Sequence, residues 1–208
     1  MIIIFYSIFV NIINLAQIEN FKTLDKASLA FEVMRPYVGG TIDDATLKNI
    51  CAETINFDFP LVPITDTISS LELFHGPTLA FKDVGARFMS RCLGYFSKQS
   101  RAENAAANND KPQEDKTQGE KPSTVLVATS GDTGGAVANG FLGVAGVDVI
   151  ILYPKGKVSP IQELQLTTLG QNITALEVDG SFDDCQAIVK EAFMDGELNA
   201  AYNLTSAN

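Results

Sequence analysis

The second half of the chain alternates short, unbroken apolar runs with segments whose apolar residues recur at helical spacing. In chain order, strand first, these segments are 123–129, 133–145, 147–154, 160–169, 172–178 and 183–193. Strands that read as continuous apolar runs are typical of a parallel sheet with helices on both faces. The pattern therefore predicts an α/β fold, in which ligands bind at the carboxyl ends of the strands.

A smaller, mainly helical region is predicted over residues 1–70. Apolar residues at helical spacing from Thr23 predict a helix that ends at Pro36 and the following glycine pair. Thr41 with Asp44 resembles the cap of a second helix. The first segment, 1–18, is atypical because it is strongly apolar and carries no charge.

That apolar start fits neither common targeting pattern. It lacks the basic start and clear cleavage site of a signal peptide. Polar residues interrupt it before it reaches the about 20 apolar residues of a spanning helix. We therefore expect no membrane role, and either a buried strand or helix or a start that does not belong to the ancestral protein.

From residue 71 the α/β region begins. SLELFH (70–75) is typical of a strand, and 82–96 has helical periodicity. The polar stretch 98–122 has almost no apolar residues, so it predicts a disordered surface insertion that cannot offset the entropy of its own ordering.

Composition and charge narrow the class of protein. The 208 residues are 46% hydrophobic and 19% charged, which is ample for a buried core. A formal net charge of -10 disfavours binding to nucleic acid. Cys51, Cys92 and Cys185 are widely spaced and His75 is the single histidine, so we expect no metal site and a reducing, cytoplasmic setting.

Three strand-to-helix corners carry candidate chemistry, and the first is FHGPTLAFKDVGARF (74–88). Lys82 follows small and apolar residues directly before a helix. Burial disfavours the charged form of a lysine, and the neutral amine can form a Schiff base with an aldehyde. The alternative is a surface lysine that pairs with Asp83, and the residues alone leave both readings open. His75 is expected to be structural, bonded to backbone in this loop, rather than a proton carrier.

The second corner is VATSGDTGGAVANGF (127–141). Glycines allow close backbone approach, and free N–H groups at a helix start attract a carboxylate or phosphate. The spacing matches neither G-x-G-x-x-G nor the G-K-[ST] nucleotide loops. The alternative is a tight turn with a small-residue packing face, but the hydroxyls of Ser130 and Thr133 favour binding.

The third corner, YPKGKVSPIQE (153–163), combines two cations with a helix start. Ser159 is a good N-cap and Pro160 a good first helical residue. Lys155 and Lys157 precede them, so either an anion site or two solvated loop lysines is predicted.

Together these corners resemble the threonine synthases, which are pyridoxal-phosphate enzymes. The matching segments are AFEVMRPYVG, FPLVP, LELFHGPTLAFKDVGARFM, ATSGDTGGAVA, VIILYPKGKVSPIQELQLTTLGQNI, DGSFDDCQAIVKEAF and NLTSAN. The resemblance covers 18–208 apart from the insertion. It implies PLP fold type II, the tryptophan synthase beta-like fold shared with the serine and threonine dehydratases.

The resemblance also implies an activity and its residues. The family converts O-phospho-L-homoserine and water into L-threonine and phosphate, as a carbon–oxygen lyase with pyridoxal 5'-phosphate as its cofactor. Lys82 matches the lysine that binds the cofactor aldehyde. The family's loop near the cofactor ring and the substrate carboxylate matches Ser130, Gly131, Asp132, Thr133 and Gly134. Thr129, Ser130 and Thr133 are expected to contribute to substrate binding. For the substrate phosphate, the expected contributors are Lys155, Lys157 and Ser159, then Ser206 and Asn208.

In length the chain departs from that family. It ends at Asn208, inside a family motif, so an incomplete α/β region corresponding to the N-terminal part of the enzyme is expected. The alternatives are another enzyme of the same fold, such as a dehydratase, and a non-catalytic remnant that binds without turnover.

Overall fold

Two compact units make up the chain, Met1–Asn56 and Phe57–Asn208, in a computed structural model that describes residues 13–108 and 122–207. The division falls earlier than the predicted boundary after residue 70. The reason is a hairpin in which β1 (Leu61–Pro63) pairs antiparallel with β2 (Ser69–Leu71). A boundary at 70/71 would cut this pairing, and the predicted strand 70–75 is reduced to its first two residues.

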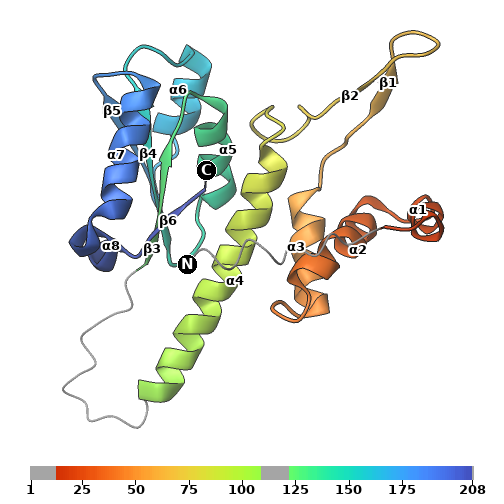
Figure 1. The fold of residues 1–208 in the computed structure, drawn as a ribbon, viewed down its shortest axis with the longest axis horizontal. Coiled ribbons are helices and arrows are strands. Elements are labelled where there is room, and N and C mark those ends of the chain that lie inside the picture. The colour runs from red at the N-terminus through yellow and green to blue at the C-terminus, as the bar shows by residue number, and fades with distance from the viewer. Residues whose placement is uncertain (1–12, 109–121, 208) are drawn as a thin grey trace. The chain divides into compact units, whose positions relative to one another are not determined.

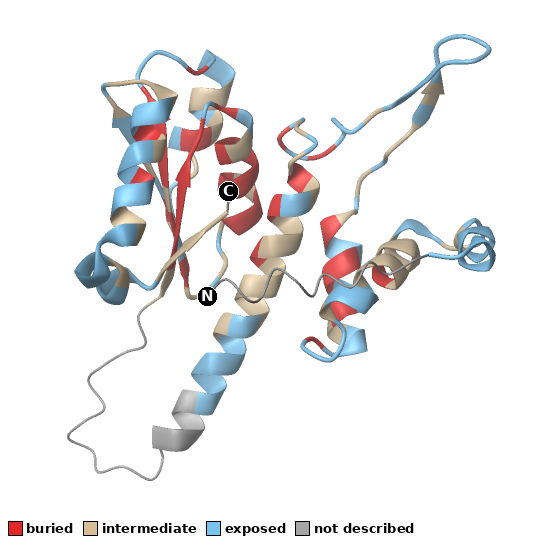
Figure 2. Ribbon diagram, viewed as in Figure 1, coloured by how far each residue is buried: buried red, intermediate tan, exposed pale blue. Residues whose placement is uncertain are grey.

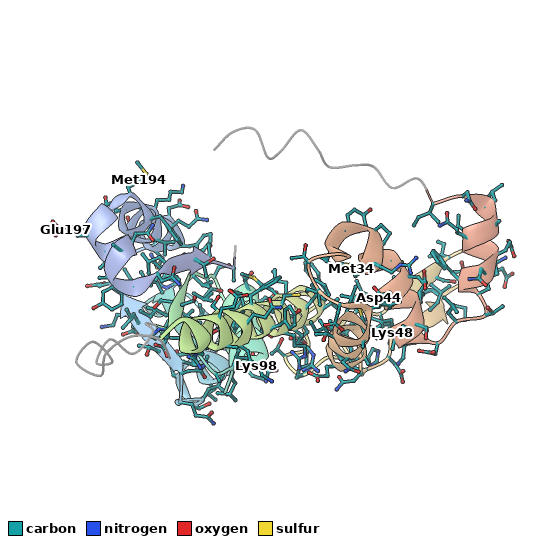
Figure 3. The ribbon with its side chains drawn as sticks, turned by 90° about the horizontal axis from the view of Figure 1, so that it is seen from below. Met34, Asp44, Lys48, Lys98, Met194 and Glu197 are labelled. Carbon is teal, nitrogen blue, oxygen red and sulfur yellow. The ribbon has the colours of Figure 1, made fainter. Side chains whose placement is uncertain are left out.

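The first unit contains α1 (Leu15–Phe21), α2 (Lys26–Val38) and α3 (Asp44–Thr54). In α3, Asp44 and Lys48 lie one turn apart (Figure 3) and both reach α2. Asp44 lies 3.9 Å from the Arg35 guanidinium, and the Lys48 ammonium lies 4.9 Å from the centroid of the buried Phe31 ring. These contacts join the two helices around Phe31.

Two predicted helix ends in this unit are corrected. The cap of α3 is Asp43, whose carboxylate accepts a hydrogen bond from the Thr46 N–H at 2.9 Å, and Thr41 has no such role. A short acidic side chain directly before the first helical residue reaches the free N–H groups more easily than Thr41 can. Pro36 does not end α2 but lies inside it, and the helix continues for two more residues to Val38.

The apolar start lies partly outside the described residues, which exclude 1–12. Its remaining apolar side chains do not form the expected buried element, since Ile13, Leu15 and Ile18 are exposed by 42%, 81% and 43%. Here α1 is held by a capping box between Asn14 and Gln17. Within the part of the chain that the structure describes, no helix has the length and apolar character needed to cross a membrane.

In the second unit a four-stranded parallel sheet has the order β5-β4-β3-β6. The strands are β3 (Ser123–Ala128), β4 (Val147–Pro154), β5 (Ile173–Val178) and β6 (Leu204–Ser206) (Figure 1). The first three are the predicted strands to within one residue, so the predicted α/β fold with a parallel sheet is confirmed. The short β6, which follows α8 (Gly196–Tyr202), has no apolar run long enough to predict it.

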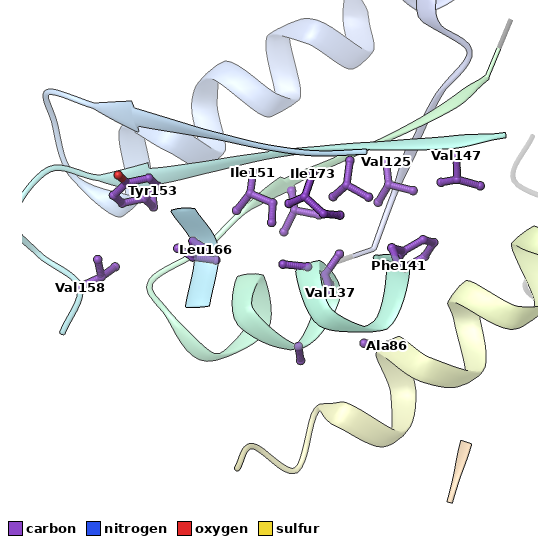
Figure 4. Packing of buried hydrophobic residues seen from close by; sticks show 14 residues of the cluster. Ala86, Val125, Val137, Phe141, Val147, Ile151, Tyr153, Val158, Leu166 and Ile173 are labelled. Atoms are coloured by element: carbon purple, nitrogen blue, oxygen red, sulfur yellow. The ribbon is translucent and has the colours of Figure 1, made fainter. Parts of the chain in front are cut away.

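Helices cover both faces of this sheet, as Figure 1 shows for α5 (Asp132–Phe141) and α7 (Phe182–Met194). Alternate strand residues face opposite sides. Val125 and Ile151 point toward α5, where Val137 and Phe141 lie (Figure 4), and Val149 belongs to the same buried cluster. Leu126, Leu152 and their neighbours pack instead against Cys185 and Val189 of α7. The buried residues accordingly concentrate in β3, β4 and α5 (Figure 2).

The long helix α4 (Asp83–Asn108) corrects the prediction of an insertion that begins at residue 98. Residues 98–108 continue the helix, because this stretch is rich in alanine, lysine, arginine and glutamate, which favour helices even without apolar partners. The rest of the predicted insertion, 109–121, lies outside the described residues. Near its start α4 packs closely on α5, where Gly140 meets the Ala86 backbone.

The order of the strands decides where a ligand can bind. From β3 the chain moves to β4 and then β5, through α5 and α6 (Pro160–Thr167). It then returns through α7 and α8 to place β6 on the other side of β3. The carboxyl ends of β3 and β6 therefore meet at the topological switch point, where open α/β sheets bind ligands.

Candidate active site

At this switch point lies a cavity of about 440 Å³. Its wall comes from the start of α4, the first turns of α5 and the residue after β6. The described lining residues are Phe81, Lys82, Gly85, Ala86, Met89, Thr133, Ala136, Val137 and Ala207. All of them are apolar or small except Lys82 and Thr133. The first and second corners of the sequence therefore meet in one cavity.

Lys82 is half-buried and immediately precedes α4. Its Nζ lies 5.0 Å from the centroid of the Phe81 ring, and among the described residues no carboxylate forms an ion pair with it. The alternative reading, in which Lys82 pairs with Asp83, fails because the Asp83 carboxylate is buried and bonded to Thr78. The amine thus faces an apolar cavity without a carboxylate partner in the described structure.

The second corner is shaped by Thr129, whose side chain is 1% exposed. Its Oγ1 accepts hydrogen bonds from the N–H groups of Gly131 at 3.0 Å and Gly134 at 2.8 Å. Gly131 has a φ of 140°, which a residue with a side chain rarely adopts. Thr129 therefore holds the turn, while Thr133, one turn into α5, lines the cavity.

The same turn is fixed from outside the cavity by α6. The Gln162 side chain donates to Asp132 Oδ1 at 2.5 Å, and its amide oxygen accepts from the Ser159 backbone and hydroxyl. Ser159 is the predicted N-cap of α6, in a capping box with Gln162. Its hydroxyl is thereby engaged in the cap.

The third corner lies apart from the cavity. Lys155 and Lys157 are exposed, and neither they nor Ser159 belong to the described lining. Lys155 Nζ is 3.9 Å from Glu177, and burial, with Glu177 and Glu163 nearby, raises the pKa of Tyr153 at the end of β4. These lysines therefore stand among acidic groups. Their role in binding the substrate phosphate stays a prediction.

The remaining predicted site residues do not line the cavity in the described structure. Ser206 directly precedes Ala207 in the lining, and Asn208 is outside the described residues. His75 is not bonded to backbone as expected, because its Nε2 lies 2.7 Å from the Glu72 carboxylate and its ring stacks on Phe74. No cluster that could hold a metal occurs in the residues searched, which are the described ones.

Sequence reasoning missed most of the apolar lining, although a signal was present. On α4 the lining residues fall three, four and seven positions after Lys82, at Gly85, Ala86 and Met89. On α5 they fall three and four positions after Thr133, at Ala136 and Val137. Such spacings place residues on one face of a helix. Small residues on these two faces leave the space that the cavity occupies.

A lysine amine in an apolar cavity at the switch point of a parallel α/β sheet is an arrangement suited to an enzyme of the class that binds an aldehyde cofactor covalently. The comparisons agree: residues 70–208 match the family model described as pyridoxal-phosphate dependent enzyme, and the chain belongs to this family.

Threonine synthases are among the relatives found by sequence and by structure. The chain is 42% identical over 194 residues to the threonine synthase of Serratia marcescens, covering 93% of this chain and 40% of that protein. The crystal structure of threonine synthase from Escherichia coli superposes with a TM-score of 0.77 at 41% identity, over 94% of this chain and 41% of that one. The PLP-bound threonine synthase from Brucella melitensis gives 0.79 at 35% identity, over 94% and 39%. The chain thus spans about two fifths of the length of these proteins.

Proposed function

We propose that this chain forms the lysine-bearing part of a threonine synthase, which converts O-phospho-L-homoserine and water into L-threonine and phosphate. The observation that carries the proposal is that Lys82 and the Thr133 end of the Ser–Gly turn line one apolar cavity. The similarity to threonine synthases over 93% of the chain supports the choice of reaction.

Pyridoxal phosphate fits the residues that line this cavity. The volume of about 440 Å³ is within the roughly 300–1,000 Å³ of small-molecule sites. The side chains of Met89, Ala136 and Val137 provide an apolar surface for a planar ring, and the Lys82 amine provides the nucleophile for an aldehyde. When bound, pyridoxal phosphate supplies an electron sink for carbanion chemistry at the substrate.

Lys82 has two tasks in this proposal. Its Nζ would hold the aldehyde carbon of pyridoxal phosphate covalently, and as a free amine it would take and return protons at the α and β carbons of the substrate. An amine that has no carboxylate partner in the described structure and lies beside an apolar wall is suited to both tasks.

The turn from Ser130 to the start of α5 binds the substrate carboxylate. Thr129 occupies the N–H groups of Gly131 and Gly134, so the turn presents the first backbone groups of α5 in a fixed direction. The positive end of the helix dipole favours an anion at this place. For the substrate phosphate, Ser206 and Asn208 beside the lining and Lys155, Lys157 and Ser159 at the third corner remain the proposed contributors.

The test is covalent capture of pyridoxal phosphate by the 208-residue chain, with borohydride reduction and mass analysis of the labelled peptide. We expect the label on Lys82 and its loss in Lys82→Ala, whereas Lys155→Ala, the loss of an exposed lysine, keeps it. Label spread evenly over several lysines would contradict the proposal. Release of phosphate from O-phospho-L-homoserine then distinguishes a threonine synthase from a dehydratase or from a remnant that binds without turnover.

A further inference from the structure

A buried carboxylate lies directly beside Lys82 and has no part in the chemistry above. Asp83 is 1% exposed. Its Oδ2 accepts a hydrogen bond from the Thr78 N–H at 2.9 Å, and its Oδ1 accepts one from the Thr78 hydroxyl at 2.5 Å. An ionised carboxylate is costly to bury unless hydrogen bonds compensate it. An acidic residue in the first turn of a helix has no need of burial, so this arrangement requires another explanation.

The loop before Lys82 is folded around this carboxylate. A Cβ on Gly76 would meet Asp83 Oδ2, so the loop can close here because residue 76 has no side chain. Leu79 has a φ of 62° and its side chain is 66% exposed, which is unfavourable on both counts for a leucine. An unfavourable backbone conformation of this kind persists only where surrounding contacts hold it in place, and such conformations are found mostly at functional sites.

Further bonds fix the backbone on each side of Lys82. The Leu79 N–H donates to the Gly76 carbonyl at 3.1 Å, and the Asp83 N–H donates to the Ala80 carbonyl at 3.0 Å. The loop is also tied to another element, since the Thr78 carbonyl accepts from the Gln165 side chain of α6 at 3.4 Å. Thr78 is therefore the point at which Asp83, the loop and α6 are joined.

We propose that Asp83 and Thr78 are positioning residues that hold the loop 76–82 so that the Lys82 amine faces the cavity. The inference rests on the proposed function, because it takes Lys82 as the residue that captures pyridoxal phosphate. Without the pair the amine is still present but is no longer held in place. Covalent capture then slows, while the sheet core, to which neither residue belongs, stays folded.

A matched control exists in the same unit. Asp184 accepts hydrogen bonds from the Ser181 N–H at 2.7 Å and the Ser181 hydroxyl at 2.7 Å, the same two bonds that Asp83 accepts from Thr78. This second pair caps α7, and neither of its residues lines the cavity. Asp184 is exposed whereas Asp83 is buried, so Asp184→Asn removes a carboxylate with the same two kinds of partner, but at the surface and without touching the loop.

The test compares Asp83→Asn, Thr78→Val and Thr78→Ser with Asp184→Asn in the 208-residue chain. Three quantities are measured: the rate at which pyridoxal phosphate is captured at Lys82, the hydrogen exchange of the Leu79 and Asp83 amides without cofactor, and the thermal midpoint. Asp83→Asn replaces one of the two acceptor oxygens by a donor, and Thr78→Val removes the hydroxyl donor. We expect both changes to slow capture about tenfold or more, as for one buried polar group left without its partner, and to speed exchange at both amides. Thr78→Ser keeps the hydroxyl, so its rates of capture and of amide exchange should lie within about twofold of the wild-type rates. Asp184→Asn should leave capture unchanged.

Capture and exchange at wild-type rates in Asp83→Asn and Thr78→Val would overturn the inference. Should Asp83→Asn fail to fold, the contrast between Thr78→Val and Thr78→Ser decides in the same way. If the wild-type chain captures nothing at Lys82, the proposed function fails instead. The exchange of the two amides then still decides whether the pair holds the loop.

Discussion

The substitution Gly134→Ala adds one methyl group to the turn beside the cavity and tests how tightly that turn is packed. A Cβ there would lie 2.5 Å from Thr129 Cγ2 and 2.9 Å from Leu166 Cδ2. Both neighbours are 1% exposed, and the threonine side chain is stiff because it is branched at Cβ. Gly134→Ala therefore leaves little room for either neighbour to move.

Two routes are open to the variant, and both cost free energy. Overpacking typically costs about 1–3 kcal/mol. Rotating Thr129 away would instead endanger its bonds to the Gly131 and Gly134 N–H groups, at about 1–3 kcal/mol for each buried donor left unpaired. Replacing a helical glycine by alanine returns about 0.5–1 kcal/mol. We expect a net loss of about 1–2 kcal/mol in the free energy of unfolding.

Urea denaturation followed by circular dichroism measures this loss. Gly196→Ala, at the start of α8, is the control, because a Cβ there meets nothing within 4 Å. Adding Thr129→Ser to Gly134→Ala removes the Cγ2 atom of the closest contact and keeps the hydroxyl. The loss of unfolding free energy in the double variant should then be about 1 kcal/mol smaller than the sum of the losses in the two single variants. Wild-type stability in Gly134→Ala, or strict additivity in the double variant, would refute the packing described here.

Three further changes have defined outcomes. Gly85→Ala should stabilise α4 by about 0.5–1 kcal/mol in urea denaturation, since a Cβ there meets nothing within 4 Å. It should also slow the capture of pyridoxal phosphate, because the added methyl group enters the cavity lining. Faster or equal capture would contradict that lining. Replacing both Lys155 and Lys157 by alanine should leave capture unchanged and weaken the binding of O-phospho-L-homoserine, and unchanged affinity would remove these lysines from the phosphate site. Hydrogen bonds from the Ser181 backbone and side chain lower the pKa of Asp184. Its contribution to stability is therefore complete above the ordinary carboxyl pKa and is lost as the pH falls through the lowered one, so the difference in urea midpoint between wild type and Asp184→Asn should shrink in acid; a constant difference would contradict the cap.

The sequence by itself determined three of the four strands of the described sheet and the starts of the helices at the corners. The strand 147–154 is found in full, because an unbroken apolar run is a local pattern that does not depend on distant residues. The helix start after Lys82 and the cap at Ser159 are local signals in the same way. The cap of α3 could not be read in this way, because Thr41 and Asp43 are both possible cap residues. The geometry of the first turn shows that Asp43 is the cap.

Tertiary structure alone decided which corners meet. Residues 204–206 are too short to read as a strand, yet their pairing with β3 puts Ala207 and the switch point beside Lys82. Strand order also separates Lys155 and Lys157 from the cavity, although their corner, like the second, leads from a strand of the sheet into a helix. Patterns of a few residues specify helices and strands, whereas the neighbour of each strand is set by packing between segments far apart in the chain.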